Sequence, residues 1–412
     1  MCDRFHLPYE SGSTGKTGGF RREFELKKFF TKKVITFIAI TILSVLFVSI
    51  GANTSKAQLL TSSDQFYRAK VIALEDVKVK EVSLDDGVSS ISSKSVYFKA
   101  EFTNGPHKGK TQTMLQYIDY MYAVQPKTVE KGDSIVVSYA ADPASSQQTW
   151  MFIDYNRIHY IIGICILFFC LLIFIGRAKG VATIVSLLFT AAAVFLVYIP
   201  GILSGQNIYL STIIISIFII LMSLTFLNGV NIKTFCAVLG NIGGLAVAGI
   251  FALITNQLLG ITGIVDEDCL FLMYVNSAHP LDLRAIVWGS IVIGSLGAVM
   301  DVAMSIASAM NELSETMEDK SAGRMIKSGM NIGKDAIGTM TNTLILAYIG
   351  GSLSSVLLLV ASNKDPLYLF NMEMIVVEVL QGIIGSTGIL FAVPVTVVIA
   401  AYLYNKPKKI QE

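Results

Sequence analysis

Two carboxylate side chains inside long apolar runs are the residues of this 412-residue chain with the most distinctive chemistry. Asp301 stands in the apolar run 285–307, and Glu378 stands in the run 374–402. An ionised carboxylate is costly in hydrocarbon, so such a group usually faces the interior of a helix bundle and takes part in proton or ion movement. The alternative is a neutral carboxyl that is held by a hydrogen bond from a Thr or Asn side chain. Both interpretations remain open from the residues alone.

Helical spacing places small and polar residues on the same face as Asp301. Steps of three and four residues along a helix bring Gly294, Gly297 and Glu312 onto this face. A face of small and polar residues is where another helix packs closely in a membrane. We therefore predict that the Asp301 face contacts a neighbouring helix.

The next apolar run, 337–361, supplies polar groups that could meet Asp301. Its first turns carry four polar residues at helical spacing: Asp335, Thr339, Asn342 and Thr343. At 1.5 Å per residue, Asn342 and Asp301 both lie about 8 to 9 Å inside the same membrane boundary. We predict that Asp301, these four residues, Glu312 and Glu378 take part in proton or ion coupling. Glu378 lies near the opposite boundary and is not expected to be a direct partner of Asp301.

Glycines at helical spacing indicate where helices approach each other closely. Gly382 and Gly385 follow Glu378 in the last run, and Gly244 belongs to a similar stripe in the run 234–259. Together with Gly294 and Gly297, they are the predicted helix-packing positions.

The elements that position these residues are membrane-spanning helices. Apolar residues make up 53% of the chain and charged residues only 15%, against about 25% charged residues in soluble domains. A helix needs about 20 residues to cross the hydrocarbon core. Eight apolar runs are long enough: 34–52, 158–175, 181–199, 210–227, 234–259, 285–307, 337–361 and 374–402. We therefore expect an α-helical membrane protein with about eight transmembrane helices.

Basic residues set the expected orientation. Residues between Arg21 and Lys33 crowd the front of the first run, and Lys406, Lys408 and Lys409 follow the last one. Lys and Arg are retained on the cytoplasmic side, so both termini should be cytoplasmic. This gives basic tails at 1–33 and 405–412, a first transmembrane helix at 34–52 and a seven-helix membrane domain at 158–404. The expected location is the plasma membrane, as a multi-pass protein.

A hydrophilic region at 60–150 separates the first two runs. β-branched and aromatic residues alternate with polar ones at 69–79 and 95–102, and turn signals follow at Asn104-Gly105-Pro106 and Lys131-Gly132-Asp133. Short strands in about ninety residues indicate a small extracytoplasmic β-rich domain, a barrel or a sandwich. We favour a packing or assembly module over a ligand-binding domain for this region.

Other function classes find little support. The sequence has no H-E-x-x-H and no G-x-S-x-G motif, so we expect no enzyme activity, cofactor or metal site. The five cysteines show no pairing or metal-binding pattern. The segment 12–17 imitates the end of a phosphate-binding loop, but Glu10 replaces its first glycine. The expected partners are the lipid bilayer and a proton or cation, with self-association left open and no nucleic acid.

The C-terminal half resembles the YibE/F family of bacterial multi-pass membrane proteins. The resemblance rests on GAVMDVAMSIA at 297–307, NEL at 311–313, GKD at 333–335 and, most specifically, GTMTNTLILAY at 338–348. We expect it to cover nearly the whole chain, including the β-rich region.

A more distant similarity concerns the RND superfamily and its export relatives SecD/SecF. These proteins place an Asp in a helix that leads to a cytoplasmic Glu, and a Thr-rich span follows. Asp301, Glu312 and the segment 339–343 match this order. The similarity implies a proton-coupled machine with Asp301 as the proton carrier, but this chain has eight apolar runs where half of such a protein has six.

Two function hypotheses follow. The first is a proton- or ion-coupled secondary transporter or exporter, in which helices with glycine faces move around an ion bound at Asp301. The alternative is a non-transporting membrane factor that binds a partner or assists assembly through the external β domain. Neutral replacement of Asp301 should abolish activity in the first case and be tolerated in the second.

Overall fold

The computed structural model describes residues 17–54, 65–83, 90–118, 126–141, 148–275, 280–317, 321–361 and 365–405. Its internal contacts divide the chain into two compact units, one of residues 60–174 and one of residues 1–59 together with 175–412. The first unit contains a β-barrel and the start of a long helix, and the second is a helical bundle. In the predicted tails at 1–33 and 405–412, Asn405 is the one residue whose side chain is described.

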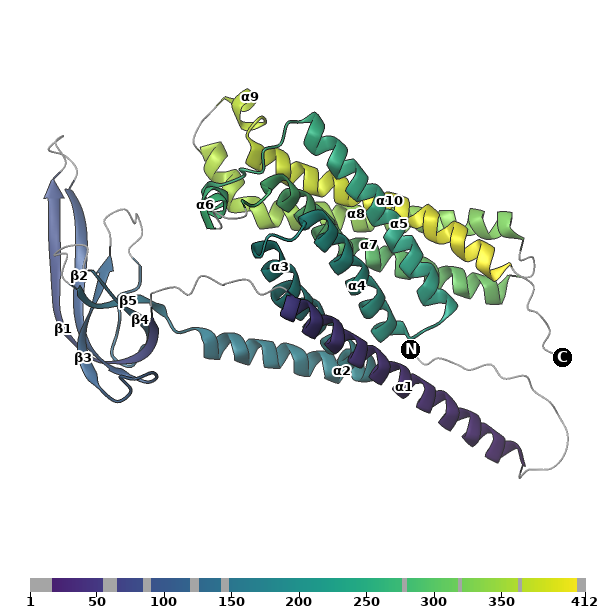
Figure 1. Cartoon of the computed structure of the whole chain (residues 1–412), viewed down its shortest axis with the longest axis horizontal. Helices are drawn as coiled ribbons and strands as arrows, with labels where there is room; N and C mark the ends of the chain where they lie inside the picture. Colours follow the sequence, from purple (N-terminus) through teal and green to yellow (C-terminus); the bar gives the residue numbers. More distant parts are fainter. Residues whose placement is uncertain are drawn as a thin grey trace. The chain divides into compact units, whose positions relative to one another are not determined.

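The β-rich region forms a closed barrel of five strands (Figure 1). The strands are β1 (Phe66–Ser83), β2 (Ser90–Phe102), β3 (Thr111–Ile118), β4 (Ser134–Ala141) and β5 (Gln148–Tyr155). They follow the order β1-β2-β3-β5-β4, and β1 closes the barrel by pairing with β4. All pairings are antiparallel except that of β3 with β5. This is the arrangement of small Greek-key barrels of the OB-fold type. The prediction of a small β domain is confirmed, and the barrel alternative is the correct one.

Alternation along the strands builds the barrel core. On β2, Val96, Phe98, Ala100 and Phe102 are at most 2% exposed and stand two residues apart, as expected for side chains on one face of a strand. The predicted turns at Gly105 and Gly132 are present, and both glycines have positive φ angles. The last strand ends at Tyr155, a few residues beyond the predicted boundary at 150.

The first two helical segments differ from their predicted bounds. The helix α1 (Thr17–Thr54) begins well before the apolar run at 34, inside the predicted basic tail. After the barrel, three helical elements follow one another with no loop between them: α2 (Ile158–Ala192), the π-helix η1 (Ala193–Tyr198) and α3 (Ile199–Leu203). They form one helical run where we expected two spans, 158–175 and 181–199.

Seven described helical runs are long and apolar enough to cross a membrane, against eight expected. The difference arises at 158–203, which counts as a single run of 46 residues. A helix of that length would measure roughly 69 Å, about twice the thickness of the hydrocarbon core. Its backbone is interrupted at Arg177, whose φ of 49° and ψ of −125° are not helical. The break lies between the two predicted spans, so the number of membrane crossings stays a prediction.

The remaining helices form the bundle (Figure 1). They are α4 (Ile208–Asn228), α5 (Ile232–Leu258), α6 (Glu267–Val275), α7 (Leu283–Thr316), α8 (Ala322–Ala361), α9 (Pro366–Leu369) and α10 (Glu373–Tyr404). Side chains of Asn207, Asn231 and Asp282 cap the N-termini of α4, α5 and α7 by accepting backbone N–H groups. The helix α10 packs against α5, α7 and α8, and α5 also packs against α7. The helix α7, which carries Asp301, thus contacts α4, α5, α8 and α10.

Candidate functional site

Asp301 lies on a side of α7 that the rest of the chain leaves uncovered. Gly297, Asp301 and Ser305, one turn apart, are all exposed in the described structure. Val299, Val302 and Ala303, on the other side of the helix, are completely buried. Within the described part of the chain, no side chain forms a hydrogen bond or ion pair with the Asp301 carboxylate. The carboxylate therefore stands in an apolar helix without a counter-charge among the described residues.

Gly297 and Gly294 distinguish two parts of this uncovered side, which we call the Asp301 strip (Gly294, Gly297, Asp301 and Ser305). A Cβ built on Gly297 would meet no atom within 4 Å. A Cβ on Gly294 would lie 2.6 Å from the hydroxyl oxygen of Tyr348 on α8. The strip is thus open around Asp301, and Tyr348 of α8 approaches it at the exposed Gly294, two turns or about 10 Å away along the helix axis.

The polar residues of α8 do not reach Asp301 in this structure. Asp335, Thr339, Asn342 and Thr343 are all exposed, as is Glu312 on α7. The hydroxyl of Thr343 donates to the backbone oxygen of Thr339 at 2.9 Å, and that of Thr339 donates to the backbone oxygen of Asp335 at 3.2 Å. These hydroxyls are bonded within their own helix. The predicted set is therefore present on α7 and α8 but is not joined by hydrogen bonds between the described side chains.

Glu378 lies in a separate cavity between α8 and α10. The cavity has a volume of about 270 Å³ and a mostly apolar lining, to which Tyr348, Ser352 and Gly382 also contribute. The hydroxyl of Tyr348 has no hydrogen-bond partner among the described residues. Since the same hydroxyl lies beside Gly294, Tyr348 lines the Glu378 cavity and also contacts the Gly294 end of the Asp301 strip.

The other predicted glycines lie in contacts of different tightness. A Cβ on Gly244 of α5 would lie 2.7 Å from the backbone oxygen of Gly388 on α10 and 3.0 Å from Val299 on α7. A Cβ on Gly385 would lie 2.9 Å from Leu344, whereas one on Gly382 would make only an ordinary contact at 3.8 Å. The helices α5, α7 and α10 therefore touch closely at Gly244, which only a residue without a side chain permits.

Asn241 was expected only as the polar end of the close-packing face that contains Gly244, and the structure shows it as a buried amide without a partner among the described residues. This residue of α5 is 0% exposed, and neither its amide nitrogen nor its amide oxygen has a partner among the described residues. An uncharged polar side chain in an apolar helix was the available signal, but the stripe of small residues around Asn241 suggested simple packing. Glu373 was also missed: it accepts hydrogen bonds from the backbone of Thr262 and Gly263 and so ties the start of α10 to the loop after α5.

Comparison with known proteins places the helical bundle in a family. A family model described as YibE/F-like protein matches residues 164–406, from within α2 to the end of α10. The matched residues exclude the barrel, which we had expected the resemblance to include. No curated protein and no solved structure matches the chain. Since the match covers more than half of the 412 residues, the chain belongs to the YibE/F-like family.

Proposed function

We propose that this membrane protein is a proton- or cation-coupled secondary transporter in which Asp301 binds the coupling ion. The observation that carries the proposal is the position of Asp301 on the uncovered side of α7, without a partner among the described side chains. Lipid does not stabilise an ionised carboxylate, so water, a cation, a bound proton or another protein must solvate or neutralise the Asp301 side chain. A transporter supplies the first three of these in turn during its cycle.

The packing of the bundle is consistent with movement around Asp301. Close contacts at Gly244 hold α5, α7 and α10 together as a compact core. The helix α8 leaves Gly297 and Asp301 uncovered and contacts α7 at Gly294 through Tyr348. A small displacement of α8 along α7 would therefore change access to Asp301 without disturbing the core. Movement of one helix group against another around a fixed site is the usual basis of alternating access.

The topology belongs to the same proposal. We place both termini in the cytoplasm and the barrel on the opposite side of the plasma membrane, because Lys and Arg concentrate in the segments that are then cytoplasmic. Asp301 lies near the cytoplasmic end of its apolar run in this orientation. The coupling ion would thus enter or leave Asp301 through the cytoplasmic half of the bundle.

The test is neutral replacement of Asp301 in cells. A strain that lacks the protein is first profiled for growth against metals, pH and drugs, and the wild-type gene must restore the altered phenotype. Asp301→Asn keeps the size of the side chain but cannot carry a proton, so the variant should accumulate normally and fail to restore growth. Glu315→Gln is the matched control, because Glu315 is an exposed carboxylate beyond the apolar run on the same helix.

Full restoration by Asp301→Asn at normal protein levels would contradict coupled transport. The assembly or partner-binding hypothesis would then lead. That second hypothesis has its own support in a pocket at one end of the barrel, whose aromatic and amide lining is suited to a ligand.

A further inference from the structure

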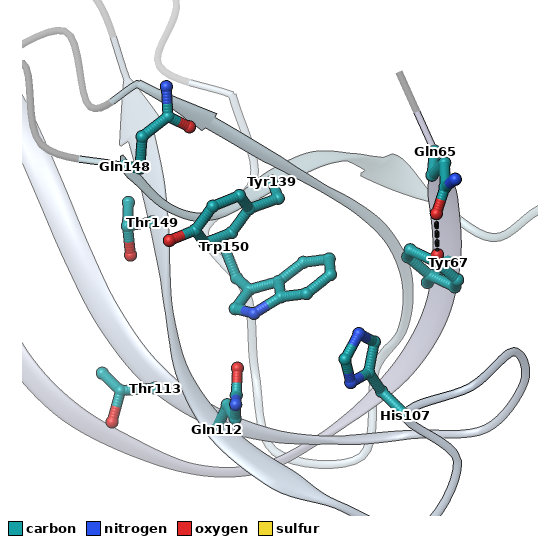
Figure 2. A pocket seen from close by; sticks show the side chains of 9 residues that line it. All are labelled: Gln65, Tyr67, His107, Gln112, Thr113, Tyr139, Gln148, Thr149 and Trp150. Atoms are coloured by element: carbon teal, nitrogen blue, oxygen red, sulfur yellow. Dashed lines mark hydrogen bonds between the residues drawn. The ribbon is translucent and has the colours of Figure 1, made fainter. Parts of the chain in front are cut away.

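One end of the barrel is hollowed into a pocket with a volume of about 760 Å³ (Figure 2). Its lining comes from the start of β1, the loop between β2 and β3, the start of β3, the end of β4 and the start of β5. Pockets of about 300–1,000 Å³ are typical of sites for small molecules. All lining residues belong to the barrel unit, so this site is separate from Asp301 and from the transport proposal.

Aromatic rings form one wall of the pocket. Trp150 is at the centre of Figure 2, and its ring centroid lies 5.6 Å from that of Tyr67, 5.4 Å from His107 and 5.3 Å from Tyr139. The interplanar angles of 57° to 73° show tilted or edge-to-face contacts. Trp150 is therefore in contact with all three of the other rings. They form a surface on which a flat ligand face can stack.

Neutral polar side chains complete the lining. The carboxamides of Gln112 and Gln148 each offer a donor and an acceptor, and Thr149 adds a hydroxyl group. The amide oxygen of Gln65 accepts a hydrogen bond from the Tyr67 hydroxyl, which leaves its NH₂ group to donate, and the Thr113 hydroxyl donates to Glu75 at 2.9 Å. Within the described residues, the lining includes no Lys, Arg, Asp or Glu. Phosphate groups are bound mainly by Lys and Arg side chains. Since the described lining contains neither, it does not favour a phosphate-bearing ligand.

The pocket is built before any ligand arrives. Gly105 in the β2–β3 loop has a φ of 74°, and a Cβ there would lie 2.5 Å from the ring of Tyr67. Backbone bonds close this loop, since Gly109 N–H donates to the oxygen of Phe102 at 2.9 Å and Phe102 N–H donates to Lys110 at 3.1 Å. The buried ring of Phe102 supports Trp150 from below, at a centroid distance of 4.8 Å. Such pre-organisation reduces the entropy lost on binding.

We propose that this pocket binds an uncharged saccharide, such as a short segment of a glycan chain. The C–H groups on a sugar ring carry partial positive charge and stack on the negative faces of aromatic rings. The hydroxyl groups of the sugar match the paired donors and acceptors of Gln112 and Gln148 and the NH₂ donor of Gln65. A purely apolar ligand would leave these amides without partners, and an anionic ligand would lack a counter-charge.

Trp150 itself provides the assay. The chain contains only two tryptophans, so Trp288→Phe leaves Trp150 as the only one. Full-length Trp288→Phe protein in detergent is titrated with chitotetraose and maltotetraose while its tryptophan emission is recorded. We expect a saturable change with at least one of the two sugars. Trp150→Phe, which retains Trp288 in the bundle, should show none.

Variants locate the sugar in the pocket. Tyr139 is 55% exposed, so Tyr139→Ala should preserve the barrel but weaken binding about tenfold through loss of a stacking surface. Gln112→Ala should weaken binding about fivefold through loss of a hydrogen bond. Tyr97→Ala is the matched control, since Tyr97 lies on β2 and does not line the pocket, and binding should remain within twofold of the parent protein.

A sedimentation experiment separates the two sources of such a ligand. Binding of soluble chitotetraose together with co-sedimentation on purified peptidoglycan would support a wall glycan. Binding of soluble sugar alone would support a free oligosaccharide. The proposal is overturned if neither sugar changes the emission of Trp150, if Tyr139→Ala binds as tightly as the parent, or if a thymidine oligonucleotide binds and the sugars do not.

Discussion

Two buried amides show how differently the barrel and the bundle treat polar groups. Gln116 in the barrel is 2% exposed; its amide nitrogen donates to the oxygen of Lys127 at 3.0 Å, and its amide oxygen accepts from Val129 N–H at 2.9 Å. Asn241 in the bundle is 0% exposed and has no partner for either amide atom among the described residues. Among the described residues, the barrel thus satisfies both amide atoms of Gln116 internally, whereas the bundle leaves those of Asn241 without a partner.

Carboxylates repeat the contrast. In the barrel, Glu75 pairs with Lys99 at 2.6 Å, and the hydrogen bond from Lys99 lowers the pKa of Glu75. Asp154 likewise pairs with Arg157 at 2.6 Å. In the bundle, Asp301 has no such partner in the described part of the chain. Polar groups without a partner are costly when they are buried or face lipid, so Asn241 and Asp301 indicate where an ion, water or a moving helix supplies the missing interactions.

The largest expected effect is on the paired amide. Gln116→Leu should lower the free energy of unfolding by about 1 to 3 kcal/mol, because the buried Val129 N–H loses its acceptor. Denaturant unfolding of full-length protein, followed by Trp150 emission in the Trp288→Phe background, measures this loss. Gln112→Leu on the same strand is exposed and should change stability by no more than about 0.5 kcal/mol. Equal effects of the two variants would show that the hydrogen bonds of Gln116 do not stabilise the barrel.

The unpaired amide should respond in the opposite direction. Asn241→Leu should leave the stability of the bundle unchanged or raise it by about 1 kcal/mol, because it removes a buried polar group that has no partner. Thermal melting of the full-length protein in detergent measures the change, and Asn241→Ala provides a variant that adds no volume. A loss of several kcal/mol in both variants would show that the Asn241 amide is bonded in the folded protein.

The smallest effect concerns an exposed ion pair of the barrel. The hydrogen bond from Arg157 and the backbone N–H of Tyr155 lower the pKa of Asp154 in the folded protein. A lowered folded-state pKa contributes stability at neutral pH that is lost as the pH falls through that pKa. Arg157→Gln should therefore cost less than about 1 kcal/mol at pH 7, and the difference should shrink in acid. A difference that grows on acidification would contradict this assignment.

Local patterns predicted much of the fold but little of the site. Alternating residues such as Val96 and Phe98 identified strands, and apolar runs identified the helices. Closure of the barrel by β1 and β4, and the meeting of Tyr67 with Trp150, depend on long-range pairing that spacing along the chain does not reveal. Helical spacing correctly grouped Gly294, Gly297 and Asp301 on one face of α7. It could not show whether a neighbouring helix covers that face, because this depends on where α8 lies.

Gly244 and Gly297 illustrate the same limit. Both belong to stripes of small residues, and both were predicted as packing positions. Gly244 lies in a contact that excludes any side chain, whereas the space beside Gly297 is open. The sequence contains the stripe, but only the packed structure distinguishes a close contact from an uncovered surface.

Carbodiimide labelling of Asp301 in native membranes shows whether this carboxylate is accessible and takes up a proton, and it needs no knowledge of the substrate. Dicyclohexylcarbodiimide partitions into lipid and reacts with protonated carboxyl groups, and peptide mass spectrometry locates the product. Our account predicts modification of Asp301 that decreases as the pH is raised, while the water-exposed, ion-paired Asp154 of the barrel stays unmodified and Asp301→Asn removes the labelled peptide. An Asp301 that stays unmodified at every pH in folded protein would contradict its assignment as an accessible, titrating carboxylate.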